Sequence, residues 1–88
     1  MAEVIIYTRP GCGYCTRAKQ LLSSKDIDFI EYNIWEKDEY QNAMIKLSGG
    51  ARTVPQIFIN GEHIGGSDDL YSLDRAGNLD VLLNQMLT

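Results

Sequence analysis

The sequence predicts an α/β fold in which a four-stranded mixed sheet is flanked by helices, in a single domain over residues 1–88. Three patterns carry this prediction. A continuous, β-branched apolar run over residues 4–8 is typical of a strand covered on both faces. Apolar residues at three- and four-residue spacing follow it and indicate a helix. Later in the chain, Asn60-Gly61 stands between the apolar run over residues 56–59 and a short segment over residues 62–64, and it indicates a β-hairpin.

The first half of the chain reads as a strand, a helix and a second strand. An Arg-Pro-Gly turn at residues 9–11 ends the first strand, and residues 23–26 close the helix. Alternation of apolar and polar residues over 30–34 predicts the second strand. The short return implies a right-handed crossover, so these two strands should be parallel. The apolar stripe of the helix consists of Cys15, Ala18, Leu21 and Leu22.

The second half predicts a helix over residues 36–48, the hairpin strands 56–59 and 62–64, and two more helices. Gly49-Gly50 should end the first of these helices. Ser67 or Asp68 should N-cap the helix that follows the hairpin. The core-facing residues of the helix over 36–48 should be Tyr40, Ala43, Met44 and Leu47. Those of the last helix should be Leu79, Leu82, Leu83 and Met86.

Composition limits the classes of function. The chain is 44% hydrophobic and 23% charged, with a net charge of −4, which is an ordinary globular profile. The negative charge argues against non-specific nucleic-acid binding. No apolar run approaches the roughly 20 residues of a membrane span, and no secretory signal is visible. We therefore expect a cytoplasmic protein with neither nucleic-acid nor membrane partners.

The two cysteines, Cys12 and Cys15, are only three positions apart, so a bond between them would constrain little of the unfolded chain. This spacing indicates a reactive cysteine pair and not a structural disulfide. Cys12 falls at the start of the first predicted helix, where unpaired N–H groups favour a thiolate. Nearby Arg9, Arg17 and Lys19 should favour it further. Cys15 lies on the apolar stripe, where burial favours the neutral thiol. The sequence thus predicts Cys12 as the nucleophile and Cys15 as the resolving thiol.

A Cys-x-x-Cys pair is also found as half of a zinc site. Tetrahedral zinc requires four ligands. The chain has no second cysteine pair, and its single histidine, His63, lies on the predicted hairpin. A zinc site within one chain is therefore disfavoured, and we expect no resident metal of this kind.

Three motifs together carry a family resemblance. Cys12-Gly13-Tyr14-Cys15 after the first strand of a βαβ unit looks thioredoxin-like. Thr53-Val54-Pro55 opens the third predicted strand, and Gly65-Gly66-Ser67-Asp68-Asp69 opens the third predicted helix. At these intervals the motifs resemble the glutaredoxin family over nearly the whole chain, and most of all its short bacterial dithiol members.

The resemblance implies a glutathione-dependent thiol-disulfide oxidoreductase that acts on glutathione mixed disulfides and protein disulfides. It implies that Arg9 faces the glycyl carboxylate of glutathione and that Tyr14 packs on the peptide. A cis peptide before Pro55 would turn the backbone of Val54 towards the cysteinyl part. The implied glutathione-binding residues are Arg9, Tyr14, Thr53, Val54, Pro55, Ser67 and Asp68. Structural roles are also open for Pro55, which suits the start of an edge strand, and for Ser67 and Asp68 as helix caps.

Gly13 departs from the commonest dithiol motif of the family, which has proline there. In the family, relaxed motifs are associated with dimers that hold a [2Fe–2S] cluster between two nucleophilic cysteines and two glutathione thiols. A cluster-binding dimer, with Cys12 as the metal ligand, is therefore the alternative to a monomeric enzyme. A third possibility is a redoxin that receives electrons from thioredoxin reductase. The expected partners are glutathione and glutathionylated or disulfide-bonded proteins.

Overall fold

The computed structural model describes residues 2–84 and confirms the predicted α/β architecture. One sheet has the strand order β2-β1-β3-β4 and contains β1 (Val4–Thr8), β2 (Ile30–Asn33), β3 (Gln56–Ile59) and β4 (Glu62–Gly65). β1 is parallel to β2 and antiparallel to β3, which is antiparallel to β4. The helices over the described residues are α1 (Gly13–Ser24), α2 (Asp38–Leu47), α3 (Ser67–Arg75) and α4 (Asn78–Asn84).

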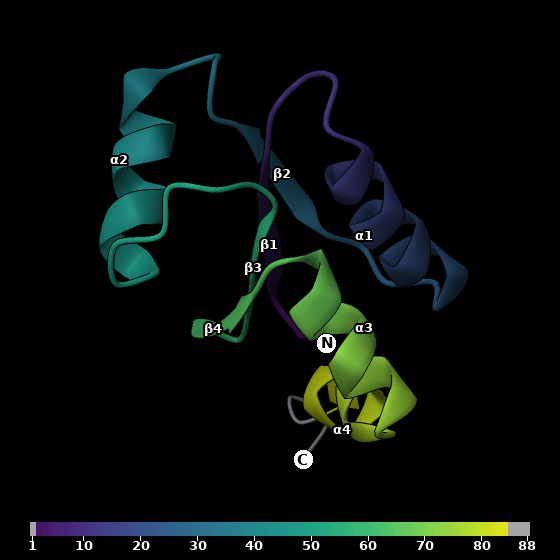
Figure 1. Cartoon of the computed structure of the whole chain (residues 1–88). Helices are drawn as coiled ribbons and strands as arrows, with labels where there is room; N and C mark the ends of the chain where they lie inside the picture. Colours follow the sequence, from purple (N-terminus) through teal and green to yellow (C-terminus); the bar gives the residue numbers. More distant parts are fainter. Residues whose placement is uncertain (1, 85–88) are drawn as a thin grey trace.

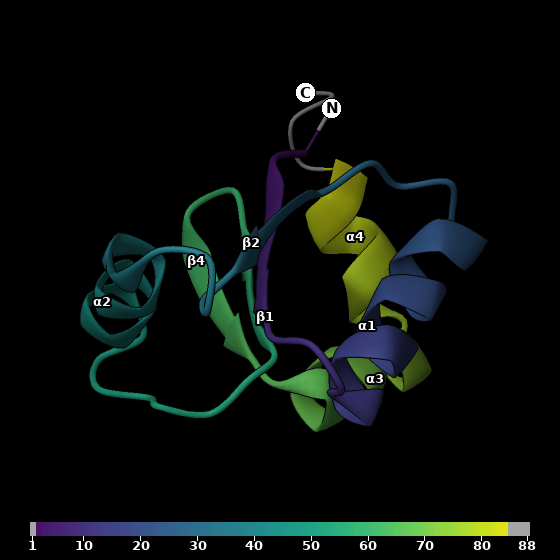
Figure 2. The ribbon, with the colours of Figure 1, turned by 90° about the horizontal axis from the view of Figure 1, so that it is seen from above.

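The sheet is the middle of three layers (Figures 1 and 2). α2 covers one face, and α1, α3 and α4 cover the other. Side chains alternate between the faces along a strand, so the apolar strands β1 and β3 contribute to both cores. Ile57 packs on the side of the three helices, whereas Phe58 packs on the side of α2. The prediction of a sheet with helices on both faces is confirmed.

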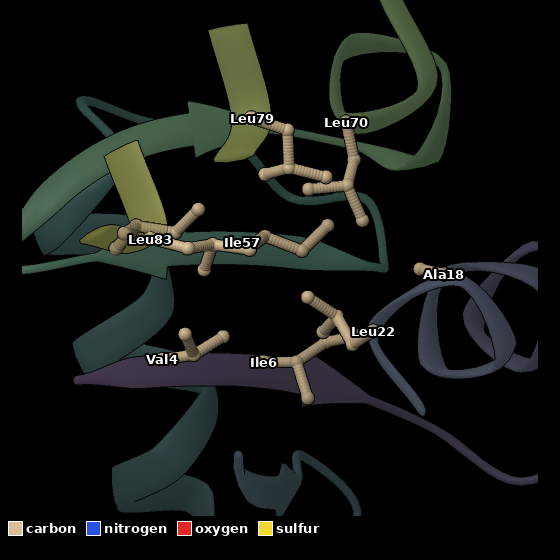
Figure 3. Packing of buried hydrophobic residues seen from close by; sticks show 9 residues of the cluster. Val4, Ile6, Ala18, Leu22, Ile57, Leu70, Leu79 and Leu83 are labelled. Atoms are coloured by element: carbon tan, nitrogen blue, oxygen red, sulfur yellow. The ribbon is translucent and has the colours of Figure 1, made fainter. Parts of the chain in front are cut away.

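Two apolar clusters hold the layers together. The larger one joins the sheet to α1, α3 and α4, and its centre is drawn in Figure 3. Burial of an aliphatic side chain of this kind contributes about 1.5–3 kcal/mol. The larger cluster comprises Val4, Ile6, Ala18, Leu22, Ile57, Ile59, Leu70, Leu79 and Leu83. The smaller one comprises Tyr7, Ile34, Met44 and Phe58. Since β1 supplies both clusters, its carboxyl end is firmly fixed, and the loop to α1 starts from a rigid point.

The start of α2 differs from the prediction. α2 begins at Asp38 instead of Glu36, because Asn33 forms a turn first. The side-chain oxygen of Asn33 accepts a hydrogen bond from the backbone N–H of Trp35 at 2.9 Å. Its carbonyl accepts one from Glu36 at 3.0 Å. At the other end of α2, Leu47 was expected in the core but is 59% exposed. Met86, expected on the core face of the last helix, lies outside the described residues.

The N-cap of α3 is Gly66, so the prediction of Ser67 or Asp68 at this position was wrong. The carboxylate of Asp69 accepts a hydrogen bond from the backbone N–H of Gly66 at 3.0 Å, as in a capping box. The carboxylate reaches this N–H because Gly65, with φ of +121°, has no Cβ; a methyl group there would collide with Asp69. Ser67 and Asp68 therefore occupy the first turn of α3, with their N–H groups directed out of the helix end.

No helix between residues 2 and 84 has both the length and the apolar character needed to cross a membrane.

Candidate active site

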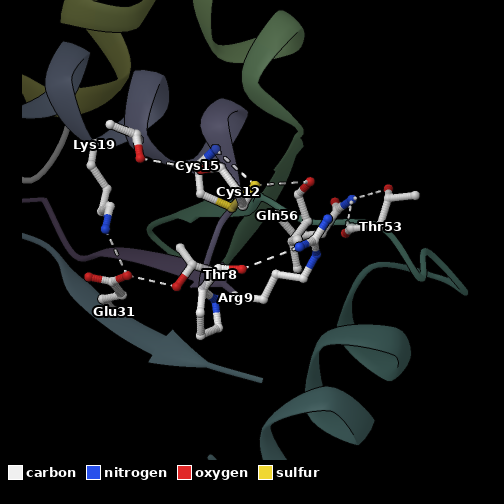
Figure 4. The surroundings of a disulfide bond; sticks show 11 residues. Thr8, Arg9, Cys12, Cys15, Lys19, Glu31, Thr53 and Gln56 are labelled. Carbon is white, nitrogen blue, oxygen red and sulfur yellow. Dashed lines mark hydrogen bonds and ion pairs between the residues drawn. A yellow bond between two sulfur atoms is a disulfide. The ribbon is translucent and has the colours of Figure 1, made fainter. Parts of the chain in front are cut away.

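Cys12 and Cys15 lie together where the chain turns from the carboxyl end of β1 into α1 (Figure 4). Cys12 is the N-cap of α1, with an extended backbone, and Cys15 is one turn further along. Their Cα atoms are 5.2 Å apart, and the two sulfur atoms form a disulfide. Cys15 is only 2% exposed, whereas Cys12 is half-buried. The two thiols therefore differ in their access to an incoming reactant.

The sulfur of Cys12 faces the donors of the helix N-terminus. The backbone N–H of Cys15 donates a hydrogen bond to Sγ of Cys12 at 3.1 Å. An N–H donor at a helix N-terminus favours the anionic form of a sulfur that it faces. On its other side, Sγ of Cys12 lies 4.0 Å from the carbonyl oxygen of Val54. Both contacts hold the sulfur in place, and the N–H donor of Cys15 favours the thiolate at Cys12.

The three basic residues expected near Cys12 take different positions. Arg9 is exposed and lies over the ring of Trp35, with its guanidinium carbon 5.7 Å from the ring centroid. Arg17 turns towards α3, where it lies 5.1 Å over the ring of Tyr71. Lys19 lines the hollow beside the cysteines but is paired with a carboxylate. The helix N-terminus is thus the most direct electrostatic influence on the sulfur.

The carboxylate that pairs with Lys19 is Glu31 of β2, and sequence reasoning gave it no role. Its Oε2 accepts a hydrogen bond from the buried hydroxyl of Thr8 at 2.7 Å and one from Nζ of Lys19 at 3.0 Å. The Thr8 hydroxyl, with a smaller effect from Lys19, lowers the pKa of Glu31 below its ordinary value. Through these two bonds, the Glu31 carboxylate on β2 links β1 and α1 next to the cysteines (Figure 4).

This network predicts a pH-dependent contribution to stability. The pKa of Glu31 is lower in the folded than in the unfolded state, so its contribution is present above about pH 4.3 and is lost as pH falls through the folded pKa. Because the side chain is 37% exposed, solvent screening limits the effect. We expect Glu31→Gln to lower the free energy of unfolding by about 0.5 kcal/mol at pH 7, and we expect this difference to shrink as pH falls below about 4.3. Urea unfolding of both proteins over a series of acidic pH values measures this. A difference that does not depend on pH would contradict it.

A second part of the site lies opposite Cys12, in the segment before β3. The Val54–Pro55 peptide bond is cis, as the family resemblance implied. This segment and the start of α3 border a hollow of about 340 Å³. Six of the seven residues implied in glutathione binding line it: Tyr14, Thr53, Val54, Pro55, Ser67 and Asp68. The seventh, Arg9, lines a neighbouring hollow that shares Thr53 and Val54 with the first.

The α3 end of this hollow combines donors with a carboxylate. Ser67 is 4% exposed, and its hydroxyl has no hydrogen-bond partner among the described residues. Asp68 is exposed, so its carboxylate is open to solvent at the same helix end. N–H groups at a helix N-terminus bind carboxylates, and a carboxylate binds an ammonium group. This end of the hollow therefore has the donors and the charge to hold a zwitterionic amino-acid group.

Residues 2–84 contain no group of three or more histidine, cysteine or acidic side chains arranged to hold a metal ion. His63 lies on β4, within hydrogen-bond distance of Gln56. Sequence reasoning gave His63 no role.

A redox-active cysteine pair at the N-terminus of the first helix, beside a cis proline on this mixed sheet, defines a thiol-disulfide oxidoreductase with a thioredoxin-like fold. The family model described as glutaredoxin matches residues 4–64. Glutaredoxin 3 of Escherichia coli strain K12 is 57% identical over 83 residues, which cover 94% of this chain and 99% of that protein. The chain belongs to the glutaredoxin family.

Two solved structures support the same assignment. The crystal structure of a buckwheat glutaredoxin–glutathione complex has a TM-score of 0.86 at 31% identity, covering 96% of this chain and 78% of that one. A structure titled for metal binding of glutaredoxins has a TM-score of 0.71 at 53% identity, covering 94% of this chain and 89% of that one. The fold and the family resemblance inferred from the sequence are both confirmed.

Proposed function

We propose that catalysis begins with attack by the Cys12 thiolate on a glutathione mixed disulfide. A new bond forms between Sγ of Cys12 and the glutathione sulfur, and the reduced substrate leaves as its thiolate. A second glutathione thiolate then attacks the glutathione sulfur bound to Cys12, which releases oxidised glutathione and restores Cys12. The observation that carries this assignment is the 3.1 Å hydrogen bond from the Cys15 N–H to Sγ of the more accessible cysteine.

For protein disulfides, Cys15 takes the second step. Attack by Cys12 leaves a mixed disulfide with the substrate protein, and the Cys15 thiolate then attacks Sγ of Cys12. The substrate leaves reduced, and the Cys12–Cys15 disulfide remains for glutathione to reduce. The 5.2 Å separation of the two Cα atoms supports this step, since it lies within the range of unstrained disulfides.

We infer that glutathione occupies the hollow between the Val54 segment and α3. In this arrangement the backbone of Val54 pairs with the cysteinyl part, which brings the glutathione sulfur towards Cys12. Ser67 and Asp68 hold the γ-glutamyl end, Tyr14 packs on the peptide, and Arg9 faces the glycyl carboxylate. Support comes from the six residues that line one hollow and from the similarity to the buckwheat glutathione complex.

A coupled assay tests the proposed function and its redoxin alternative. The protein is mixed with a small glutathione mixed disulfide, and NADPH consumption is followed with either glutathione plus glutathione reductase or thioredoxin reductase as the electron source. Rapid turnover with glutathione and little with thioredoxin reductase is the expected result. The reverse preference would contradict glutathione dependence.

We further propose that the substrates are glutathionylated or disulfide-bonded proteins in a reducing compartment such as the cytoplasm. Both cysteines belong to the reactive pair, and the sequence has no further cysteine for a structural disulfide. The expected resting state is a monomer.

We propose a second candidate function, a glutathione-ligated [2Fe–2S] dimer, because of Gly13. One chain has a single accessible thiolate, so a cluster needs two copies of Cys12 and two glutathione thiols to reach four ligands. Gly13 follows Cys12 directly and is exposed, and a Cβ built on it meets no atom within 4 Å. The surface at Gly13, the residue after Cys12, is thus open to a second subunit. The similarity to a structure concerned with metal binding of glutaredoxins supports this candidate.

The cluster candidate predicts an effect of Gly13→Pro. Gly13 is the first residue of α1, a position that favours proline, so this change should leave the helix intact. Anaerobic purification with glutathione should yield a brown dimer for the natural sequence and at least about fivefold less iron per chain for the variant. Visible absorbance and gel filtration measure this. A colourless natural protein under these conditions would contradict the candidate without affecting the oxidoreductase proposal.

A further inference from the structure

We propose that His63 is a positioning residue for the glutathione site: through Gln56, it holds the Thr53–Val54 segment at its working distance from Cys12. This inference rests on the proposed function and assigns the residue that keeps one wall of the site in place. His63 belongs to β4 and lines the hollow between the Val54 segment and α3 together with Gln56 and Thr53.

His63, Gln56 and Thr53 form a continuous series of hydrogen bonds. Nε2 of His63 is 2.7 Å from Oε1 of Gln56. Nε2 of Gln56 donates to the carbonyl oxygen of Thr53 at 3.0 Å and lies 3.3 Å from its hydroxyl. Gln56 is only 4% exposed, so its amide must find its partners inside the protein. His63 supplies the partner that the amide oxygen requires.

The direction of each hydrogen bond follows from the Thr53 carbonyl, which can only accept. The amide nitrogen of Gln56 must therefore face Thr53, and the amide oxygen must face His63. The ring nitrogen Nε2 must then carry a proton and donate it. Removal of this donor leaves the amide oxygen of Gln56 without a partner, and the amide loses the contact that fixes its orientation.

The histidine ring is itself held in place. His63 pairs with Phe58 in the antiparallel ladder between β3 and β4. The two rings pack with centroids 5.0 Å apart. Phe58 belongs to the smaller apolar cluster under α2, so the exposed residue His63 packs its ring against a core residue. The N–H of His63 is thus held in a fixed position towards Gln56. It orients the Gln56 amide, and that amide in turn positions Thr53.

The last residue in this series of hydrogen bonds, Thr53, is next in sequence to the residue that contacts the reactive sulfur. Thr53 is followed directly by Val54, whose carbonyl oxygen lies 4.0 Å from Sγ of Cys12. In the proposed complex the Val54 backbone pairs with the cysteinyl part of glutathione. Displacement of this segment therefore weakens glutathione binding, while the α1 N-terminus that favours the Cys12 thiolate is unchanged.

Two variants separate the donor from the bulk of the ring. His63→Phe keeps an aromatic ring against Phe58 but has no N–H to donate. His63→Gln places an amide nitrogen at about the position of Nε2 and restores the donor. We expect His63→Phe to raise KM for a glutathione mixed disulfide about fivefold, with kcat and the alkylation rate of reduced Cys12 within about twofold of the natural protein. His63→Gln should return KM to within about twofold.

A double-mutant cycle with Gln56→Leu provides the coupling test. In the Gln56→Leu background, His63→Phe should raise KM no further, since the series of hydrogen bonds from His63 to Thr53 is already interrupted. Glu62→Gln, at the exposed neighbouring position on β4, is the matched control and should leave KM unchanged. An unchanged KM in His63→Phe, an equal rise in His63→Gln, or additive effects in the cycle would each overturn the proposal.

A readout independent of turnover keeps this inference separate from the proposed function. The backbone amide resonances of Thr53 and Val54 in a ¹H–¹⁵N spectrum should shift in His63→Phe and return in His63→Gln, while those of α1 stay in place. Unmoved Thr53 and Val54 resonances would overturn the positioning role. A natural protein with no glutathione turnover would contradict the proposed function instead.

Discussion

Cys12→Ser is expected to abolish both the reduction of glutathione mixed disulfides and the reduction of protein disulfides. Serine keeps the size of the side chain, but its hydroxyl does not ionise at neutral pH and forms no disulfide. The loss should exceed about a thousandfold in kcat/KM, close to the rate without enzyme. The glutathione-coupled assay with a small mixed disulfide measures the first activity, and reduction of a disulfide-bonded protein measures the second.

Cys15→Ser is the matched control for this result, because it makes the same sulfur-to-oxygen replacement one helical turn further along α1. We expect it to keep most activity on glutathione mixed disulfides, since that route needs one thiol, and to lose at least about tenfold on protein disulfides. Thermal unfolding of the reduced proteins should show that both serine variants are folded. Residual mixed-disulfide turnover in Cys12→Ser, or loss of both activities in Cys15→Ser, would contradict the proposed roles.

The fold could be predicted where a local signal decided it. The apolar run over residues 4–8, the Asn60-Gly61 turn and the spacing of Cys15, Ala18 and Leu22 each define an element without reference to the rest of the chain. The start of α2 could not be predicted in this way, because two backbone N–H groups bind Asn33 first. That competition depends on how the chain leaves β2.

The site could be predicted only in part, for a similar reason. The cysteine pair, the Val54–Pro55 segment and the start of α3 are contiguous motifs. The structure places Val54 beside the sulfur of Cys12 and across one hollow from the start of α3. The partners of Glu31 and His63 are distant in the sequence or become neighbours only once the sheet has formed. A carboxylate on an edge strand and a histidine on a hairpin look like ordinary surface residues until their partners are known. Networks of this kind can be recognised only once the tertiary structure is known.

Asp68→Asn is expected to impair glutathione use while leaving the chemistry of Cys12 intact. In the proposed complex the Asp68 carboxylate meets the ammonium group of the γ-glutamyl end, and the asparagine amide cannot replace that charge. We expect KM for the glutathione mixed disulfide to rise about tenfold, which corresponds to about 1.4 kcal/mol of binding free energy. The alkylation rate of Cys12 should not change, because the N–H donor from Cys15 remains.

Asp69→Asn is the natural comparison, because the two neighbouring carboxylates have different tasks in the structure. Asp69 caps α3 through the Gly66 N–H, whereas Asp68 is exposed at the hollow. Loss of the Asp69 charge should therefore lower the melting temperature more than loss of the Asp68 charge. Added salt should raise KM of the natural protein more than that of Asp68→Asn, since salt screens an exposed ion pair. An unchanged KM in Asp68→Asn would remove Asp68 from the glutathione site and leave the helix N–H groups as the only anchor at this end.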